Sequence, residues 1–309
     1  MRKDAPVPFN SNKADIILRS SDDVYFRVYR CLLAFASPFF DSMFDLPQPQ
    51  VRSTEEEMLH GLEVIPATEN GRVLDMLLRF CYPATVDDPR LENAVDIEGV
   101  LEAAVKYGME EVERKVRRTL LEPSILEKAT PHVFSIAYRF HYGAEATAAA
   151  TCLLRQPAPP ADPTTLKYIS RAQLQNLAVY RAQCAHAVLA LGNNLSWLQR
   201  KESYGFFKWW TNCCMCTKQA DARFLMHGAY AREWWAEYMV ETLAILQETP
   251  CATVVYQNVQ KALERAGGCT FCRQKSQHYM SDFVQRFAEA IDEAVAGVSA
   301  CLLVHGWPS

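Results

Sequence analysis

The sequence predicts an α+β domain at the N-terminus, followed by a mostly α-helical region. Two short segments, 16–19 and 25–30, alternate their side chains with the period of a strand and are joined by the turn residues Ser20-Ser21-Asp22-Asp23. Compact apolar helices follow them directly. Beyond residue 165 the chain is predicted to be helical, and in its last helix apolar residues recur every three or four positions.

The first helices are predicted at 31–36 and from Pro38 onward. Pro38 prevents the first helix from continuing, and Ser37-Pro38 is typical of a new helix start, because serine caps well and proline at the first position loses only an unpaired N–H. The second helix carries more apolar surface than one turn can bury. We therefore expect other parts of the molecule to cover it.

The rest of the N-terminal domain is predicted as a loop at 45–61, a strand at 62–66 and three helices. The helices cover 70–82, 96–107 with Asp96 as N-cap, and 110–121, where acidic residues precede basic ones at i,i+4. Residues 1–12 are expected to be a disordered lead-in. The domain itself is predicted at 13–122.

A helical extension is predicted at 123–156 and a linker at 157–164, where prolines are dense. This linker is the expected boundary of a helical domain at 165–309. Its predicted helices are 166–191, 195–210, 220–247, 253–266 and 276–303. The last one has a long apolar stripe that includes Phe283, Phe287 and Ile291, and Trp234 and Trp235 are expected to pack in the core.

Bulk properties favour an intracellular protein, cytoplasmic or nuclear. The chain has 309 residues, half of them hydrophobic, and a net charge of −4, made up of −7 before residue 164 and +3 after it. Neither half is basic enough to predict a nucleic-acid binder. We expect no secretion and no membrane partner, because no signal peptide and no apolar run of about 18 residues is present.

Two cysteine pairs predict a structural zinc site. Among eleven cysteines, Cys213/Cys216 and Cys269/Cys272 form C-x2-C pairs, which suit the four soft ligands of Zn²⁺ in a reducing compartment. The 52 residues between the pairs must fold back to bring them together. Cys214 is an alternative to Cys213, and Cys184 or His278 could replace one ligand.

Residues 15–44 resemble the opening of a BTB/POZ domain. The resemblance is carried by Asp15, Phe26, Leu33 and a second-helix pattern of Ser37, Pro38, Phe40 and Phe44, whereas Tyr29 stands where the family usually has histidine. The resemblance implies a fold of a small sheet with clustered helices, and self-association or partner docking. By the same resemblance the interface residues are Asp15, Tyr29, Arg30, Leu33 and Phe40.

Nearly the whole chain also resembles the BTB-domain proteins abundant in basidiomycete fungi. Four segments carry this resemblance: Leu46–Pro49, Leu77–Pro83, Leu101–Tyr107 and Tyr180–Cys184. It implies an N-terminal BTB domain followed by a helical region with paired cysteines.

A protein-interaction module that forms homo-oligomers is the function this sequence favours. Some BTB proteins deliver substrates to cullin-3 ubiquitin ligases, and 124–154 lies where such adaptors place a supporting helix pair, but no motif decides the matter. The alternative is a transcription or chromatin regulator that uses the C-terminal cysteines. We expect no enzyme, because G-x-S-x-G, H-E-x-x-H and a Gly-rich phosphate loop are all missing from the sequence.

Overall fold

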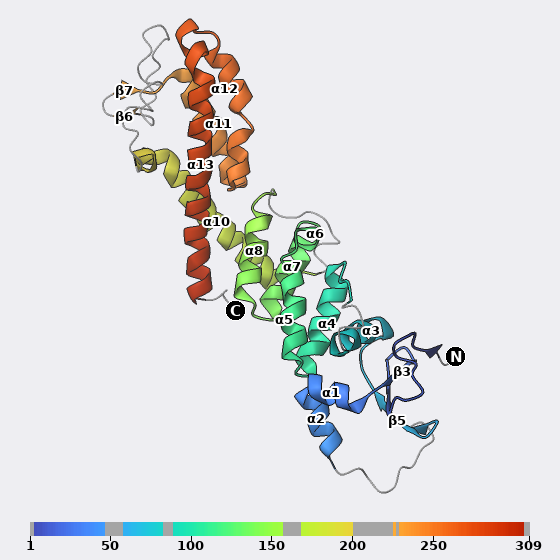
Figure 1. The fold of residues 1–309 in the computed structure, drawn as a ribbon. Helices are drawn as coiled ribbons and strands as arrows, with labels where there is room; N and C mark the ends of the chain where they lie inside the picture. The colour runs from blue at the N-terminus through green and yellow to red at the C-terminus, as the bar shows by residue number, and fades with distance from the viewer. Residues whose placement is uncertain are drawn as a thin grey trace. The chain divides into compact units, whose positions relative to one another are not determined.

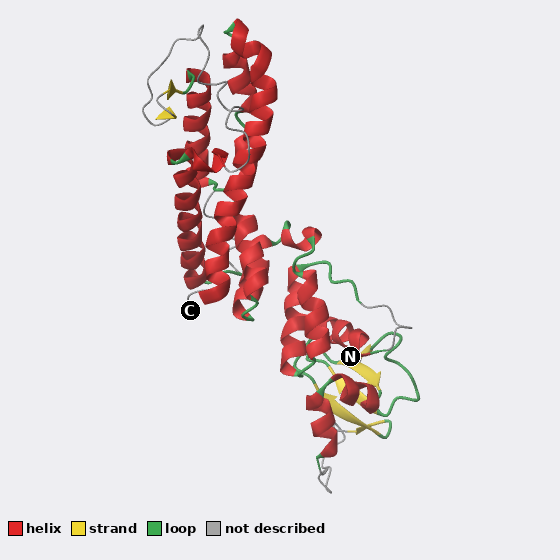
Figure 2. Cartoon of the chain, turned by 60° about the vertical axis from the view of Figure 1, so that its left-hand side comes forward, coloured by secondary structure: helices red, strands yellow, loops and turns green. Residues whose placement is uncertain are grey.

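The chain forms two compact units, residues 1–129 and 130–309. The computed structural model describes residues 3–46, 58–82, 89–156, 168–199, 225–226 and 229–305 (Figure 1). The first unit combines a small sheet with helices and the second is mostly helical, which confirms the predicted fold class (Figure 2). No helix in these ranges is both long and apolar enough to cross a membrane.

The sheet of the first unit has five strands in the order β1-β3-β2-β5-β4. Their bounds are β1 Lys3–Asp4, β2 Ile16–Arg19, β3 Val24–Val28, β4 Met58–Leu59 and β5 Leu62–Pro66. Strand β2 pairs antiparallel with β3 and parallel with β5. The predicted strands at 16–19 and 62–66 are confirmed, and β3 ends two residues earlier than expected.

Strand β2 is buried on both faces. Ile16, Ile17 and Leu18 are successive residues that point to alternate sides of the sheet, yet each is at most 1% exposed. Leu18 pairs in register with Phe26 of β3, which is equally buried. Both faces of the sheet therefore need a cover.

The N-terminal segment supplies part of that cover, and the predicted disordered lead-in is wrong for residues 3–12. Strand β1 pairs in parallel with β3, and Phe9 is completely buried. The Phe9 ring lies 5.6 Å from that of Phe26 and meets Tyr82 edge-on at 5.1 Å. Burying one large aromatic side chain contributes about 2–3 kcal/mol, enough to hold a short segment in place.

Six helices complete the first unit within its described residues, 3–46, 58–82 and 89–129. Their bounds are α1 Arg30–Ala36, α2 Pro38–Asp45, α3 Gly71–Cys81, α4 Ala94–Lys106, α5 Glu110–Thr119 and α6 Pro123–Leu126. Ser37 caps α2 as predicted, its hydroxyl accepting from the Phe40 amide.

Asn93, and not Asp96, is the N-cap of α4. The side-chain oxygen of Asn93 accepts from the amide of Asp96, so the N-cap lies three residues earlier than predicted. Both residue types are good caps, which explains the error.

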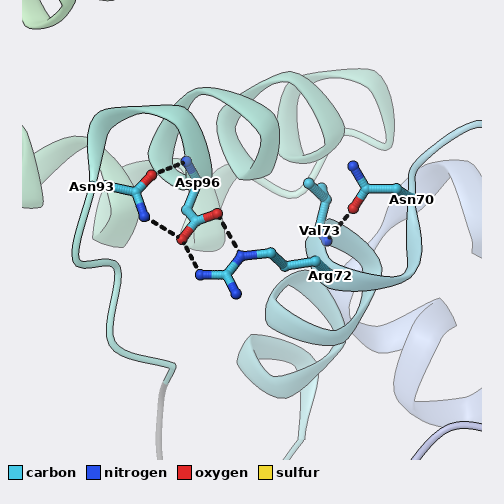
Figure 3. A network of polar contacts seen from close by, with 5 residues as sticks. All are labelled: Asn70, Arg72, Val73, Asn93 and Asp96. Carbon is cyan, nitrogen blue, oxygen red and sulfur yellow. Dashed lines mark hydrogen bonds and ion pairs between the residues drawn. The ribbon is translucent and has the colours of Figure 1, made fainter.

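Asp96 instead joins α4 to α3 (Figure 3). Its carboxylate accepts two hydrogen bonds from Arg72, at 2.8 and 2.6 Å, and a third from the side-chain amide of Asn93 at 2.7 Å. Asp96 is nearly buried, whereas the Arg72 side chain is 70% exposed. These hydrogen bonds hold the pKa of Asp96 below its usual value.

The second unit is built around long helices. Their bounds are α7 Thr130–Arg139, α8 Gly143–Leu153, α10 Arg171–Asn193, α11 Glu233–Glu248, α12 Val259–Ala266 and α13 Thr270–His305, with short 3-10 helices η2 Leu195–Gln199 and η5 Ala252–Tyr256. Strands β6 Leu225–Met226 and β7 Ala229–Tyr230 form a small hairpin where a helix from 220 was predicted. Much of the predicted helix 195–210 lies outside the described residues.

An aromatic core fills the second unit. Phe283 and Phe287 of α13 are fully buried, with Trp235 of α11 5.4 Å from Phe283 and Trp197 5.3 Å from Phe287. Ile291 continues the same buried stripe. The predicted core face of α13 is confirmed.

The boundary between the two units lies at residues 129–130, not at the proline-rich segment. Helices α7 and α8, which were predicted as an extension of the first domain, pack with the second unit, where α8 lies along α13. The predicted linker 157–164 itself lies outside the described residues. Proline density marks a break in helix, but it does not tell which elements pack together.

We predict that Asp96→Ala lowers the free energy of unfolding of the first unit by about 1–3 kcal/mol, because it removes charge-assisted hydrogen bonds. All six tryptophans lie after residue 196, so their fluorescence reports the second unit alone. In urea titrations we expect a shifted circular-dichroism transition and an unchanged fluorescence transition. Glu111, which forms an exposed ion pair with Arg114, supplies a control. Glu111→Ala should lower the free energy of unfolding by at most about 0.5 kcal/mol.

The destabilisation caused by Asp96→Ala should also depend on pH. Because the pKa of Asp96 is lowered in the folded state, its stabilisation is fully present above the ordinary aspartate value of 3.8 and is lost as the pH falls below it. The stability difference between the native chain and Asp96→Ala should therefore shrink below pH 3.8. A difference that grows on acidification would contradict this assignment.

Candidate interaction surface

Asp15 is bonded to the start of α1. Its carboxylate accepts a hydrogen bond of 2.8 Å from the backbone N–H of Arg30, the first residue of the helix. Tyr29, in the N-cap position, makes no side-chain cap bond. Asp15 therefore satisfies a helix amide that would otherwise lack a partner, and its charge suits the positive end of the helix.

The Arg30 side chain bonds elsewhere in the same unit. Its guanidinium lies 2.5 Å from the carboxylate of Glu63 on β5 and 5.2 Å from the centre of the Phe44 ring on α2. It thus links α1, α2 and the sheet. Asp15 and Arg30 are brought together through the backbone, and both are occupied by contacts within the chain.

Tyr29 contacts the N-terminal segment. Its hydroxyl lies 2.9 Å from that of Ser11, and the ring is half-buried. The hydroxyl of Tyr29, the residue that stands in place of the family's histidine, thus has a partner in Ser11 that no local pattern predicts. This contact depends on the ordering of residues 3–12.

Leu33 and Phe40 lie in the core. They are 0% and 3% exposed, so neither side chain can contact another molecule. Phe40 stacks on Tyr107 with ring centres 4.9 Å apart, and the Ser37 hydroxyl donates to the carbonyl of Tyr107. Both residues anchor α1 and α2, so placing them in the interface was wrong.

Three other side chains of α1 and α2, which the sequence analysis missed, are exposed instead. Phe35 is 96% exposed, Phe39 is 48% exposed, and Cys31 lies one helical turn before Phe35. We call Cys31, Phe35 and Phe39 the α1–α2 surface. A signal was available, because residues i and i+2 lie about 200° apart on a helix, so burying Leu33 turns Phe35 outward.

Cys269 and Cys272 flank the start of α13. Cys269 directly precedes the helix, and Cys272 is buried in its first turn. The Arg273 guanidinium donates to the carbonyl of Gly267 from Nε at 2.9 Å and from a terminal nitrogen at 2.5 Å. These bonds fix the turn that carries the cysteine pair.

The predicted partner cysteines Cys213, Cys214 and Cys216 lie outside the described residues. Within the ranges that are described, no three His, Cys, Asp or Glu residues are arranged to hold a metal. His278 is exposed on α13, six residues after Cys272 and about 120° around the helix from it.

Cys184 lies too far from Cys272 to replace a ligand. It follows Tyr180 by one turn of α10, and the Tyr180 hydroxyl is 2.8 Å from that of Ser299. Residues 272 to 299 of α13 span about 40 Å at 1.5 Å per residue. Burial also raises the pKa of the Cys184 thiol to about 11, which disfavours the thiolate that zinc requires.

Comparison with known proteins identifies one family. Residues 9–124 match the family model of the BTB/POZ domain, and this range covers most of the first unit. No curated protein matches the sequence.

The burial of Phe40 and the partial exposure of Phe39 predict truncation effects of different size. Phe40→Ala should lower the free energy of unfolding of the first unit by about 3–5 kcal/mol, because it opens a cavity beside Tyr107. Phe39→Ala, its matched control, should cost less than half as much. Urea titration followed by circular dichroism measures both, and equal effects would contradict the assignment.

Proposed function

We propose that this chain, in which residues 9–124 form a BTB/POZ domain, is a protein-interaction module that self-associates through the α1–α2 surface. BTB/POZ domains generally mediate protein–protein interaction and oligomerisation. The single observation that carries the proposal is the nearly complete exposure of Phe35. Moving an exposed phenylalanine side chain out of water is favourable by about 2–3 kcal/mol.

The chemistry of the surface favours a second copy of the same chain. Cys31 and Phe35 share one side of α1, and Phe39 adds a half-exposed ring at the start of α2. Most soluble homo-oligomers are two-fold dimers, in which one surface meets its own copy, so each exposed apolar group meets another. A stable dimer buries about 1,200 Å² or more, so these side chains would form its centre and not its whole extent.

The residues first assigned to the interface support this surface from inside. Asp15 fixes the first turn of α1, Arg30 joins it to α2 and β5, and Tyr29 joins it to the N-terminal segment. Because the exposed rings sit on short, anchored helices, little side-chain and backbone freedom is lost on association.

We predict that Phe35→Glu converts the self-associated protein into a monomer. A charge in the centre of an apolar interface must be buried without a partner, which costs several kcal/mol. Light scattering coupled to size-exclusion chromatography measures the mass of the particle in solution. Val95→Glu is the matched control, because Val95 is also exposed in the same unit but lies on α4.

Three results decide this proposal. A native chain that is monomeric at tens of micromolar would exclude self-association, and a Phe35→Glu chain that keeps the native mass would exclude the α1–α2 surface. Cys31 provides a third measurement, since a short bis-maleimide should link two chains through it. Cross-linking should disappear in Cys31→Ser and in Phe35→Glu.

We also propose that the C-terminal cysteines bind one structural zinc ion. Support comes from the placement of Cys269 and Cys272 about the first turn of α13, which suits two thiolates on one side of a metal, together with the Cys213-x2-Cys216 pair in the sequence. With four thiolates the ion would have no open position. Zinc would join segments of the second unit and activate no water.

Metal analysis tests this prediction. Protein purified without chelator should contain about one zinc per chain, and Cys272→Ser should lose it, because three thiolates hold zinc more weakly than four. Cys184→Ser should retain it, since Cys184 lies elsewhere in the unit. A native chain without zinc, or a Cys272→Ser chain that keeps its zinc, would contradict the site.

The more specific roles, those of a ubiquitin-ligase adaptor or of a transcription or chromatin regulator, stay predictions. Titration of the intact chain with the purified N-terminal domain of cullin-3 tests whether it is a ubiquitin-ligase adaptor. The alternative, a transcription or chromatin regulator, predicts binding to random duplex DNA at low salt with a steep salt dependence. An intracellular location, the absence of catalysis and the kinship with basidiomycete BTB proteins likewise rest on the sequence alone.

A further inference from the structure

One side of α10 is held by hydrogen bonds. Gln173, Asn176 and Tyr180 follow one another at i, i+3 and i+7, which places them on the same side of the helix. Gln173 bonds to the side chain and carbonyl of Ser135 on α7, and the Asn176 amide donates to the Tyr138 hydroxyl at 2.9 Å.

The Tyr180 hydroxyl joins three helices. It lies 2.9 Å from the hydroxyl of Thr151 on α8 and 2.8 Å from that of Ser299 on α13. Tyr180 and Ser299 are both buried. We call this set of contacts, from Gln173 to Tyr180, the α10 seam, because it joins the α7–α8 hairpin to the rest of the second unit.

Arg181 closes the end of the seam. Its guanidinium donates to the carbonyls of Leu153 at 2.6 Å, Gln156 at 2.8 Å and Glu248 at 2.9 Å. Leu153 and Glu248 are the last residues of α8 and α11, where helix carbonyls have no partner in their own helix. A positive group also suits the negative ends of both helices.

The rest of the second unit is joined differently. Helices α11 and α13 interlock through Trp235, Tyr238 and Phe283, large rings that are all fully buried. In α8, many of the buried side chains are alanines, which remove little apolar area from water. Polar contacts exchange with water more readily than an aromatic core separates, so regions of one fold differ in their opening equilibria.

We propose that the α7–α8 hairpin opens from α10 and α13 as a cooperative segment, with Arg181 as the latch that keeps it closed. The device lies in the second unit and does not depend on self-association through α1 and α2. Opening would expose the hydroxyls of Thr151, Tyr180 and Ser299, while the aromatic core stays intact.

Hydrogen exchange of the intact chain tests the latch. In Arg181→Met, which keeps an apolar stem but loses every donor, the amides of Leu154, Arg155, Gln156 and Thr249 should exchange at least tenfold faster. Each of them donates near the end of α8 or α11. Amides of 283–291 in the α13 core and of 94–106 in the first unit should keep their native rates.

The control is Arg171→Met, which removes an exposed arginine from the first turn of the same helix. It should leave all these rates unchanged. Native exchange at the ends of α8 and α11 in Arg181→Met would overturn the proposal. A uniform acceleration from 130 to 305 would also overturn it, because Arg181 would then stabilise the unit as a whole.

A second variant decides the matter if Arg181→Met does not fold. Tyr180→Phe keeps the buried ring and loses only the hydroxyl that bonds to Thr151 and Ser299. It should accelerate exchange within α7 and α8 and leave 283–291 unchanged. Equal effects on α8 and on 283–291 would exclude a separately opening hairpin.

Discussion

The double burial of strand β2 is the constraint on which the N-terminal unit depends. Three successive side chains, Ile16 to Leu18, point to alternate faces and none of them reaches water. A sheet in this position must be covered on both sides, in contrast to a two-layer fold with one wet face. Phe9 lies on the Phe26 side of the sheet, and the N-terminal segment is ordered for that reason.

The same constraint determines which parts of α1 and α2 remain exposed. Both helices are short and each buries one principal side chain, Leu33 or Phe40, so the remaining apolar residues cannot all turn inward. The Ser37-Pro38 junction fixes the change of direction between them, because the Ser37 hydroxyl bonds to both the Phe40 amide and the Tyr107 carbonyl. Because the two helices are firmly anchored, these apolar side chains cannot turn inward. Association with another protein molecule is therefore the way in which they can be buried.

Local patterns in the sequence were enough to predict much of this architecture. The strands at 16–19 and 62–66, the serine cap of α2 and the buried stripe of α13 each depend on residues close in the chain. The ordered N-terminal segment could not be predicted in this way, since its polar, proline-containing composition is typical of disorder and a single aromatic residue decides the outcome.

The sequence analysis predicted where the candidate surface lies, but not which side chains form it. Resemblance pointed to α1 and α2, but it assigned the contact to the side chains that define the fold, Leu33 and Phe40, because a pattern of apolar residues does not separate those that pack inward from those that face a partner. Helical geometry does make that separation once one buried residue is known. Asp15 and Arg30 were likewise expected at the interface, whereas the structure joins them within the chain through the Arg30 amide.

Helix α10 shows why the domain boundary escaped prediction. One side of this helix carries the polar groups of Gln173, Asn176 and Tyr180 in its first half and continues into the buried apolar residues Cys184 and Val188 in its second half. Because the first half of this buried side is polar, it shows no apolar stripe there, and hydrophobic periodicity does not reveal which helices it packs against. The α7–α8 hairpin is joined to it by hydrogen bonds across a segment whose prolines suggest separation. Proline composition describes the local path of the chain, whereas membership of a folded unit is decided by contacts distant in sequence, and here the contacts made by Gln173, Asn176 and Tyr180 are polar.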